Sequence, residues 1–182
     1  MLDLDQAELA LNPTRTRVWA PVGVPWPVET PGENRKQQLF GAVNSRTGQT
    51  HFALRPRKTS ADFQAFVDRE VLPAYPGAEF VFLVVDGSGI YTSKSTRAWL
   101  AARPQVLLVP LPKYAPELNL QEHLWRWLRA EVTHNHFFRT FAAAVAAARR
   151  FFARLAAHPD LVLRRIGRAY ARTLESHLAA VL

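Results

Sequence analysis

The sequence contains no cysteine, which excludes disulfide bonds, a thiol nucleophile, and zinc or iron–sulfur sites bound by cysteine. It also contains no apolar run near the roughly 18 residues that a membrane-spanning helix requires. Two aspartates lie among the first five residues, where a secretory signal peptide carries positive charge. These absences predict a soluble protein of the reducing cytoplasm that does not enter the membrane.

Acidic residues are scarce relative to basic ones: 15 Asp and Glu against 23 Lys and Arg give a net charge of +8. Such a charge raises the local concentration of a polyanion such as nucleic acid. By itself it does not separate functional from incidental binding. The chain has 182 residues, of which 48% are hydrophobic, and this is enough for one domain with a substantial core.

The opening of the chain is predicted to form strands around one long loop. Residues 2–11 have the composition of a strand, residues 12–16 that of a turn, and residues 17–20 that of a returning strand. Residues 21–35 contain four prolines and two glycines, a density that excludes regular structure. A loop of this length in a compact domain is functional or disordered, so an interaction loop and a loose surface loop both stay open.

Strands and helices alternate in the remainder of the chain. Residues 80–85 form an unbroken apolar run, which is typical of a strand covered on both faces. A last, basic helix is predicted from about residue 161, and its arginines fit a solvated face as well as a DNA contact. The other predicted elements are a hairpin at 37–44 and 49–54, a helix from Ser60 to about Leu72, a helix at 93–102, a strand at 106–109, and a core-facing helix between Phe138 and Leu155.

Two carboxylates lie where neighbouring elements are expected to meet. Asp86 directly follows the apolar strand, and Glu122 lies at the start of a predicted helix. Carboxylates in these positions can converge at one edge of a sheet and bind a hard cation such as Mg²⁺ through oxygen. Glu122, Arg126 and Arg129 lie off the apolar stripe of the helix, which comprises Leu120, Leu124, Trp127 and Leu128.

Each carboxylate also has a purely structural interpretation. Asn119 followed three residues later by Glu122 is the pattern of a capping box, in which two side chains satisfy free helix amides. Asp86 precedes a glycine, and Asp-Gly is a common turn dipeptide. Near the start of the chain, Asp3 and Asp5 compete as a further carboxylate, because alternation along a strand places both on one face.

Two segments resemble the catalytic core of bacterial insertion-sequence transposases of the mariner superfamily, which belong to the DDE group of ribonuclease H-like enzymes. Residues 84–91 read Val-Val-Asp-Gly-Ser-Gly-Ile-Tyr, where the family has a strand ending in Asp-Asn with a His a few residues later. Residues 114–125 read Tyr-Ala-Pro-Glu-Leu-Asn-Leu-Gln-Glu-His-Leu-Trp, where the family has Tyr-Ser-Pro-Asp/Glu-Leu-Asn-Pro-x-Glu-x-x-Trp. The family's first aspartate matches Asp5, since Asp-Gln-Ala-Glu-Leu corresponds to Asp-Glu-x-x-Leu.

The resemblance implies an α/β protein with the ribonuclease H-like fold, a mixed five-stranded sheet with helices on both faces. Residues 1–157 would form the DDE catalytic domain, with a clamp-like loop at 21–36, and residues 158–182 would form a C-terminal basic helix. The loop would pack against a second subunit through Trp19 and Trp26, giving a homodimer. The N-terminal helix-turn-helix region that relatives place before the first catalytic strand is expected to be absent.

The resemblance further implies DNA strand cleavage and strand transfer in transposition. Asp5, Asp86 and Glu122 would hold two Mg²⁺ ions, with Mn²⁺ as a substitute, because paired ions can activate the attacking hydroxyl and stabilise the leaving oxygen. The partners would be transposon ends and target DNA, and the expected location is the cytoplasm, in association with the nucleoid. The residues expected to contact DNA are Lys113, Tyr114, Asn119, Arg126 and Arg129.

Four residues depart from the family pattern, and none of them is an expected metal ligand. Gln6 replaces Glu, Gly87 replaces Asn, Tyr91 replaces His and Leu120 replaces Pro. Recognition of transposon ends would need a separate chain that carries a helix-turn-helix. Two other interpretations stay open: an inactive truncated remnant that binds DNA non-specifically without cleaving it, and a nuclease of the same fold without strand transfer.

Overall fold

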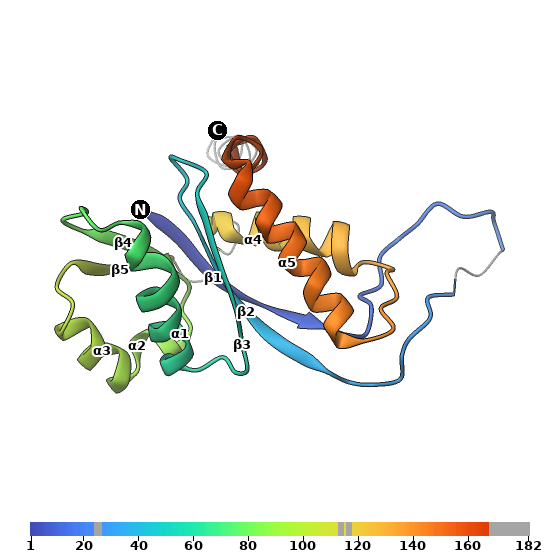
Figure 1. The fold of residues 1–182 in the computed structure, drawn as a ribbon, viewed down its shortest axis with the longest axis horizontal. Helices are drawn as coiled ribbons and strands as arrows, with labels where there is room; N and C mark the ends of the chain where they lie inside the picture. Colours follow the sequence, from blue (N-terminus) through green and yellow to red (C-terminus); the bar gives the residue numbers. More distant parts are fainter. Residues whose placement is uncertain (24–26, 113–114, 116–117, 168–182) are drawn as a thin grey trace.

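The computed structural model describes residues 1–23, 27–112, 115 and 118–167. The strands are β1 (Leu2–Ala10), β2 (Lys36–Val43), β3 (Thr50–Arg55), β4 (Val81–Val85) and β5 (Val106–Pro110), in the spatial order β3-β2-β1-β4-β5. β2 pairs antiparallel with β1 and β3, whereas β4 pairs parallel with β1 and β5. The predicted mixed five-stranded sheet is therefore confirmed (Figure 1).

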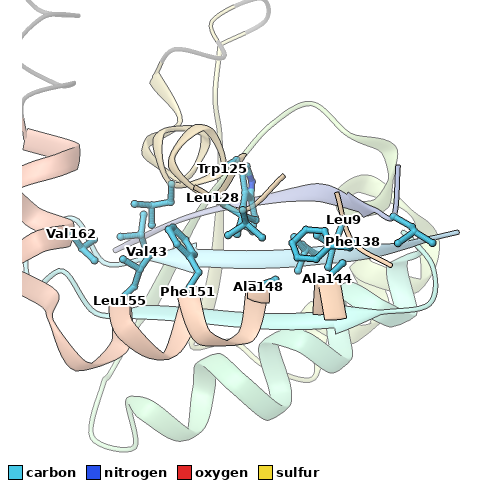
Figure 2. Close-up of a cluster of buried hydrophobic side chains, with 14 of the residues drawn as sticks. Leu9, Val43, Trp125, Leu128, Phe138, Ala144, Ala148, Phe151, Leu155 and Val162 are labelled. Atoms are coloured by element: carbon cyan, nitrogen blue, oxygen red, sulfur yellow. The ribbon is translucent and has the colours of Figure 1, made fainter. Parts of the chain in front are cut away.

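The prediction that helices cover both faces of the sheet is also confirmed. Successive side chains of β2 point to opposite faces of the sheet and pack into two separate cores. Leu39 and Val43 belong to one buried cluster, and Phe40 and Ala42 belong to the other. Figure 2 shows the first cluster, which lies between the sheet and helices α4 and α5. The helices are α1 (Ser60–Phe66), α2 (Gly89–Thr92), α3 (Lys94–Ala101), α4 (Leu120–Leu128) and α5 (Phe141–Ala157).

Side-chain caps set where the helices begin. Thr59, and not the predicted Ser60, is the N-cap of α1, and its Oγ1 accepts the backbone N–H of Asp62 at 3.2 Å. Ser93 and Thr140 cap α3 and α5 in the same way. The helix predicted to end at about Leu72 continues after Phe66 as a π-helical turn (Val67–Val71) and a 3₁₀ turn (Leu72–Ala74), so the helical segment ends about two residues later than predicted.

The predicted returning strand at 17–20 is wrong, because β1 is followed on the sheet by β2. The segment after β1 instead runs beside the end of the α4 region, where the backbone N–H of Thr14 donates to the carbonyl of Thr133 at 3.2 Å. The described residues between β1 and β2 project away from the sheet in Figure 1. Trp19 on this segment is fully exposed, so it has no sheet partner that would favour a strand.

The prediction that residues 80–85 are covered on both faces is also wrong. β4 begins at Val81, and Phe82 is 39% exposed. Leu107 and Val109 of β5 are exposed to a similar extent. In the part of the chain that the structure describes, α4 and α5 contact β1, β2 and β3, so one face of β4 and β5 is left open.

The described start of the predicted C-terminal basic helix packs into the core. Residues 159–167 are helical, and Val162 and Ile166 are buried in the same cluster as α5. The remainder of this predicted helix, 168–182, lies outside the described residues, and the division at residue 158 stays a prediction. Within the described chain, no helix is long and apolar enough to cross a membrane.

The β2–β3 turn holds the start of this helix, and a glycine makes the contact possible. Gly48 has a φ of +75°, and a Cβ there would lie 2.2 Å from the carbonyl oxygen of Pro159.

Gly48→Ala should lower the free energy of unfolding by about 3 kcal/mol, because backbone strain and overpacking add. Urea denaturation measures this loss. The control Gly77→Ala, which meets nothing within 4 Å, should stay within about 0.5 kcal/mol of the parent, and equal losses would contradict the assignment.

Candidate active site

Asp5 and Asp86 come to the same level of the sheet because β1 and β4 run parallel. The register pairs Asp3 with Val84, so Asp5 and Asp86 each lie two residues further along neighbouring strands. Asp86 follows the last residue of β4, and its Oδ1 accepts the backbone N–H of Ser88 at 3.0 Å. The strand register thus brings Asp5 and Asp86 to one edge of the sheet, whereas the convergence predicted from the sequence was that of Asp86 with Glu122.

Helix α4 carries Glu122 and is attached to β1 at its first turn. Asn119 Nδ2 donates to the carbonyl of Leu4 at 3.1 Å, and Asn119 Oδ1 accepts the N–H of Gln121 at 3.1 Å. Asn119 is therefore the N-cap and also a link to the sheet. Its buried side chain is engaged within the protein, which fits a role in orienting Glu122; its contact with DNA stays a prediction.

The Glu122 carboxylate faces two arginines of its own helix region. Arg129 donates to Glu122 Oε1 at 2.7 Å, and Arg126 Nε lies 3.6 Å from the same oxygen. This arrangement differs from a reciprocal capping box, in which the Glu side chain turns back to the N-cap amide. Arg126 and Arg129 thus lie beside the predicted site. Lys113 and Tyr114 lie outside the described residues.

The electrostatics of Asp5 link the three carboxylates. Burial raises the pKa of Asp5 to about 6, and the negative charges of Asp86 and Glu122 raise it as well. Each of these two carboxylates is therefore near enough to Asp5 to repel its charge. A bound cation would relieve this repulsion, and three carboxylates supply the oxygen donors that Mg²⁺ accepts.

The described carboxylates fit a metal ion by donor chemistry, but they are not already gathered around one point. Among residues 1–23, 27–112, 115 and 118–167, no group of three or more His, Asp or Glu side chains is arranged to hold a metal. The arginine contacts of Glu122 show one reason, since its carboxylate is turned toward Arg129. Coordination by all three residues would require this side chain to reorient.

Asp3, the competing candidate for the first carboxylate, has different surroundings. It is 4% exposed, and the backbone amide of Leu120, at the start of α4, lies near its carboxylate and counteracts part of the effect of burial on its pKa. Burial raises the pKa of Asp3 to about 6. Asp86 and Glu122 act on the pKa of Asp5, whereas Asp3 lies beneath the helix start. These surroundings favour Asp5 as the carboxylate of the site.

Two of the four departures from the family pattern touch one another. Gln6 Nε2 donates to the hydroxyl of Tyr91, and both side chains are buried. Burial raises the pKa of Tyr91 well above its ordinary value, and the charges of Asp86 and Asp5 add to this effect. The phenol therefore stays neutral and lies close to the carboxylates, a pairing that the separate positions in the sequence did not indicate.

Trp125 is a site residue to which the sequence analysis assigned no role. Its indole Nε1 donates to Asp5 Oδ2 at 3.1 Å. The predicted apolar stripe of α4 was partly wrong, because Gln121 and Trp125 are buried with Leu124 and Leu128, whereas Trp127 is only half-buried. The spacing in the sequence could have indicated this role for Trp125. Trp125 follows Glu122 by three residues, which places the two side chains on neighbouring parts of one helix face.

Asp3→Asn should stabilise the protein in a pH-dependent way. The folded-state pKa of about 6 lies above the ordinary 3.8, so the stability that this carboxyl contributes is full below pH 4 and is lost as the pH rises through 6. The variant should therefore gain about 2 kcal/mol in the free energy of unfolding at pH 8 and little at pH 4. Chemical denaturation in EDTA at both pH values tests this, and an equal gain at both would refute it.

Comparison with known proteins gives a family match over most of the chain and relatives that are longer than it. Residues 1–143 match the DDE superfamily endonuclease family. The "Insertion element IS630 uncharacterized 39 kDa protein" of Shigella sonnei is 34% identical over 132 residues, which are 72% of this chain and 38% of that protein. The Mos1 strand transfer complex gives a TM-score of 0.68 at 15% identity and covers 94% of this chain and 51% of that chain.

The mariner Mos1 paired end complex, in structures with Mg and with Mn, gives a TM-score of 0.65 at 16% identity. The match covers 94% of this chain and 54% and 52% of those chains. This likeness confirms the ribonuclease H-like fold. The chain spans about half the length of these structures and less of the IS630 protein. Because the family match extends over residues 1–143, the chain belongs to the DDE superfamily endonucleases.

Proposed function

We propose that this chain carries the catalytic core of a DDE transposase, which cleaves DNA strands and transfers them during transposition. The observation that carries the proposal is the parallel register of β1 and β4, which brings Asp5 and Asp86 to one level of the sheet beside α4, the helix of Glu122. The family match and the likeness to Mos1 complexes support the same function. A basic protein with an acidic site suits a polyanionic substrate, since its net charge is +8.

Asp5, Asp86 and Glu122 are proposed to hold two Mg²⁺ ions, with Mn²⁺ as a substitute. Their oxygen donors and mutual repulsion support this assignment, and Mos1 structures with Mg and with Mn have the same fold. Two bound ions would activate the attacking water or 3′ hydroxyl and stabilise the leaving oxygen. Burial of Asp5 and its bond to Trp125 hold one carboxylate in place.

Arg126 and Arg129 are proposed to contact the phosphate backbone, together with Lys113, Tyr114 and Asn119. The first two guanidinium groups lie at the rim of the site, bonded to or beside Glu122. A phosphate that takes over these guanidinium groups would free the carboxylate for coordination. Such contacts predict DNA binding that weakens steeply with salt. The proposed place of action is the nucleoid.

Recognition of transposon ends and assembly into a dimer are further parts of the proposal. A helix-turn-helix on a separate chain would recognise the transposon ends, since such modules read base edges in the major groove. The dimer would form when another copy of this chain packs against the loop at 21–36. Of the two predicted anchors, Trp19 is fully exposed, as is Val22 close to it in the sequence, whereas Trp26 lies outside the described residues. Exposed apolar side chains often mark an interface.

The proposed catalytic residues can be tested by cleavage of labelled duplex DNA with Mg²⁺ or Mn²⁺. Asp5→Asn, Asp86→Asn and Glu122→Gln should each lower the nicking rate roughly a thousandfold or more, because paired metals supply several kcal/mol of transition-state stabilisation. Asp3→Asn, the matched control two residues from Asp5, should retain nicking. A parent protein that binds DNA without nicking it, and variants that bind equally, would indicate a non-catalytic DNA-binding protein instead.

The dimer can be tested by sedimentation velocity over a range of concentrations. Trp19→Ser should weaken self-association about thirtyfold, because an exposed tryptophan that becomes an interface anchor contributes about 2 kcal/mol or more. Phe80→Ser is the control, since Phe80 is also exposed but precedes β4. A parent protein that stays monomeric, or a loss that is equal in both variants, would exclude this interface.

A further inference from the structure

Trp125 makes a polar contact that connects two of the elements of the site. Its side chain is fully buried, and a buried indole N–H requires an acceptor. The acceptor is Oδ2 of Asp5, at 3.1 Å, on a strand 120 positions away in the sequence. Helix α4 also carries Glu122, one turn before Trp125. The hydrogen bond therefore joins Asp5, one proposed metal ligand, to the helix that carries Glu122, another proposed ligand.

The indole reaches Asp5 because the neighbouring strand has no side chain in its path. The register of β1 and β2 places Gly41 opposite Asp5. A Cβ on Gly41 would lie 2.6 Å from Cη2 of Trp125 and 2.8 Å from Cζ2, distances that van der Waals contact does not permit. Any other residue at position 41 would therefore push the ring away from the strand and from Asp5.

Aromatic packing holds the ring in this orientation. Phe52 of β3 and Phe152 of α5 contact Trp125 edge to face, with ring centroids 5.7 Å and 6.5 Å away. The indole is thus enclosed by side chains of two further elements. Its N–H direction is set before any ligand binds, which makes it suitable for orienting a carboxylate.

We propose that Trp125 is a positioning residue of the metal site, which holds Oδ2 of Asp5 and leaves Oδ1 to face the cation. The inference rests on the proposed role of Asp5 as a metal ligand. A free carboxylate rotates and must be ordered when it coordinates, whereas the indole bond restricts this rotation in advance. Partners that orient metal ligands in this way typically contribute about 10- to 100-fold to metal affinity or activity.

Trp125→Phe separates the hydrogen bond from the packing, because it removes the N–H and keeps an aromatic ring. The matched control is Trp127→Phe on the same helix. Trp127 is half-buried, its Nε1 donates to Glu131, and its ring packs on Phe151 at 5.6 Å. The control therefore makes the same chemical change without touching Asp5.

The measurement is Mn²⁺ binding, followed by electron paramagnetic resonance, together with the Mn²⁺ dependence of DNA nicking. Trp125→Phe should weaken Mn²⁺ binding about 10- to 100-fold, and high Mn²⁺ should restore the nicking rate. Trp127→Phe should bind Mn²⁺ as the parent does. Equal Mn²⁺ affinity in Trp125→Phe and the parent would overturn the inference while leaving the role of Asp5 intact.

Two further measurements separate the possible failures. If Asp5→Asn binds Mn²⁺ as tightly as the parent, the proposed metal site itself is wrong, and the inference falls with it. If Trp125→Phe does not fold, the indole N–H signals of the parent protein are followed by NMR during a Mg²⁺ titration. The Trp125 signal should shift with metal occupancy while that of Trp127 stays in place, and an unmoved Trp125 signal would overturn the inference.

Discussion

The attachment of α4 to β1 is the constraint on which the site depends. Two successive residues of β1 take part: the carbonyl of Leu4 accepts a hydrogen bond from Asn119, and Asp5 accepts one from Trp125. One donor is the N-cap residue and the other lies in the second turn of the helix. These contacts set both where α4 begins and how it is rotated, so they decide which way its first-turn carboxylate points.

The same attachment concentrates negative charge in a protein that is basic as a whole. Asp3 and Asp5 both have pKa values raised to about 6, chiefly by burial, so keeping them ionised costs folding free energy at neutral pH. Arg126 and Arg129 offset part of the local charge through Glu122. A cation bound at such a site would relieve the same repulsion among the carboxylates, and it would release the guanidinium groups of Arg126 and Arg129 to pair with a phosphate.

The predictions from the sequence were wrong for two segments whose burial or pairing depends on other helices and strands. The run at 80–85 has the composition of a doubly covered strand, yet Phe82 is exposed, because α4 and α5 contact β1, β2 and β3 in the described chain. Residues 17–20 have strand-like composition without a neighbouring strand to pair with. Composition indicates whether a segment can form a strand. Whether it pairs with another strand, and whether helices cover its faces, depends on segments far away in the chain.

The sequence by itself determined the five strands of the sheet, although it also predicted a strand at 17–20 that does not form. It further determined the order of the elements, the family and the proposed pair Asp86 and Glu122. These features are encoded locally, by apolar runs, turn residues and a motif of a dozen consecutive positions. The motif match favoured Asp5 over Asp3, but only the tertiary structure shows that Asp5 lies near those carboxylates, that Gln6 meets Tyr91 and that Trp125 meets Asp5. These contacts join residues about 80 to 120 positions apart, and strand register and helix rotation set them, which no local pattern contains.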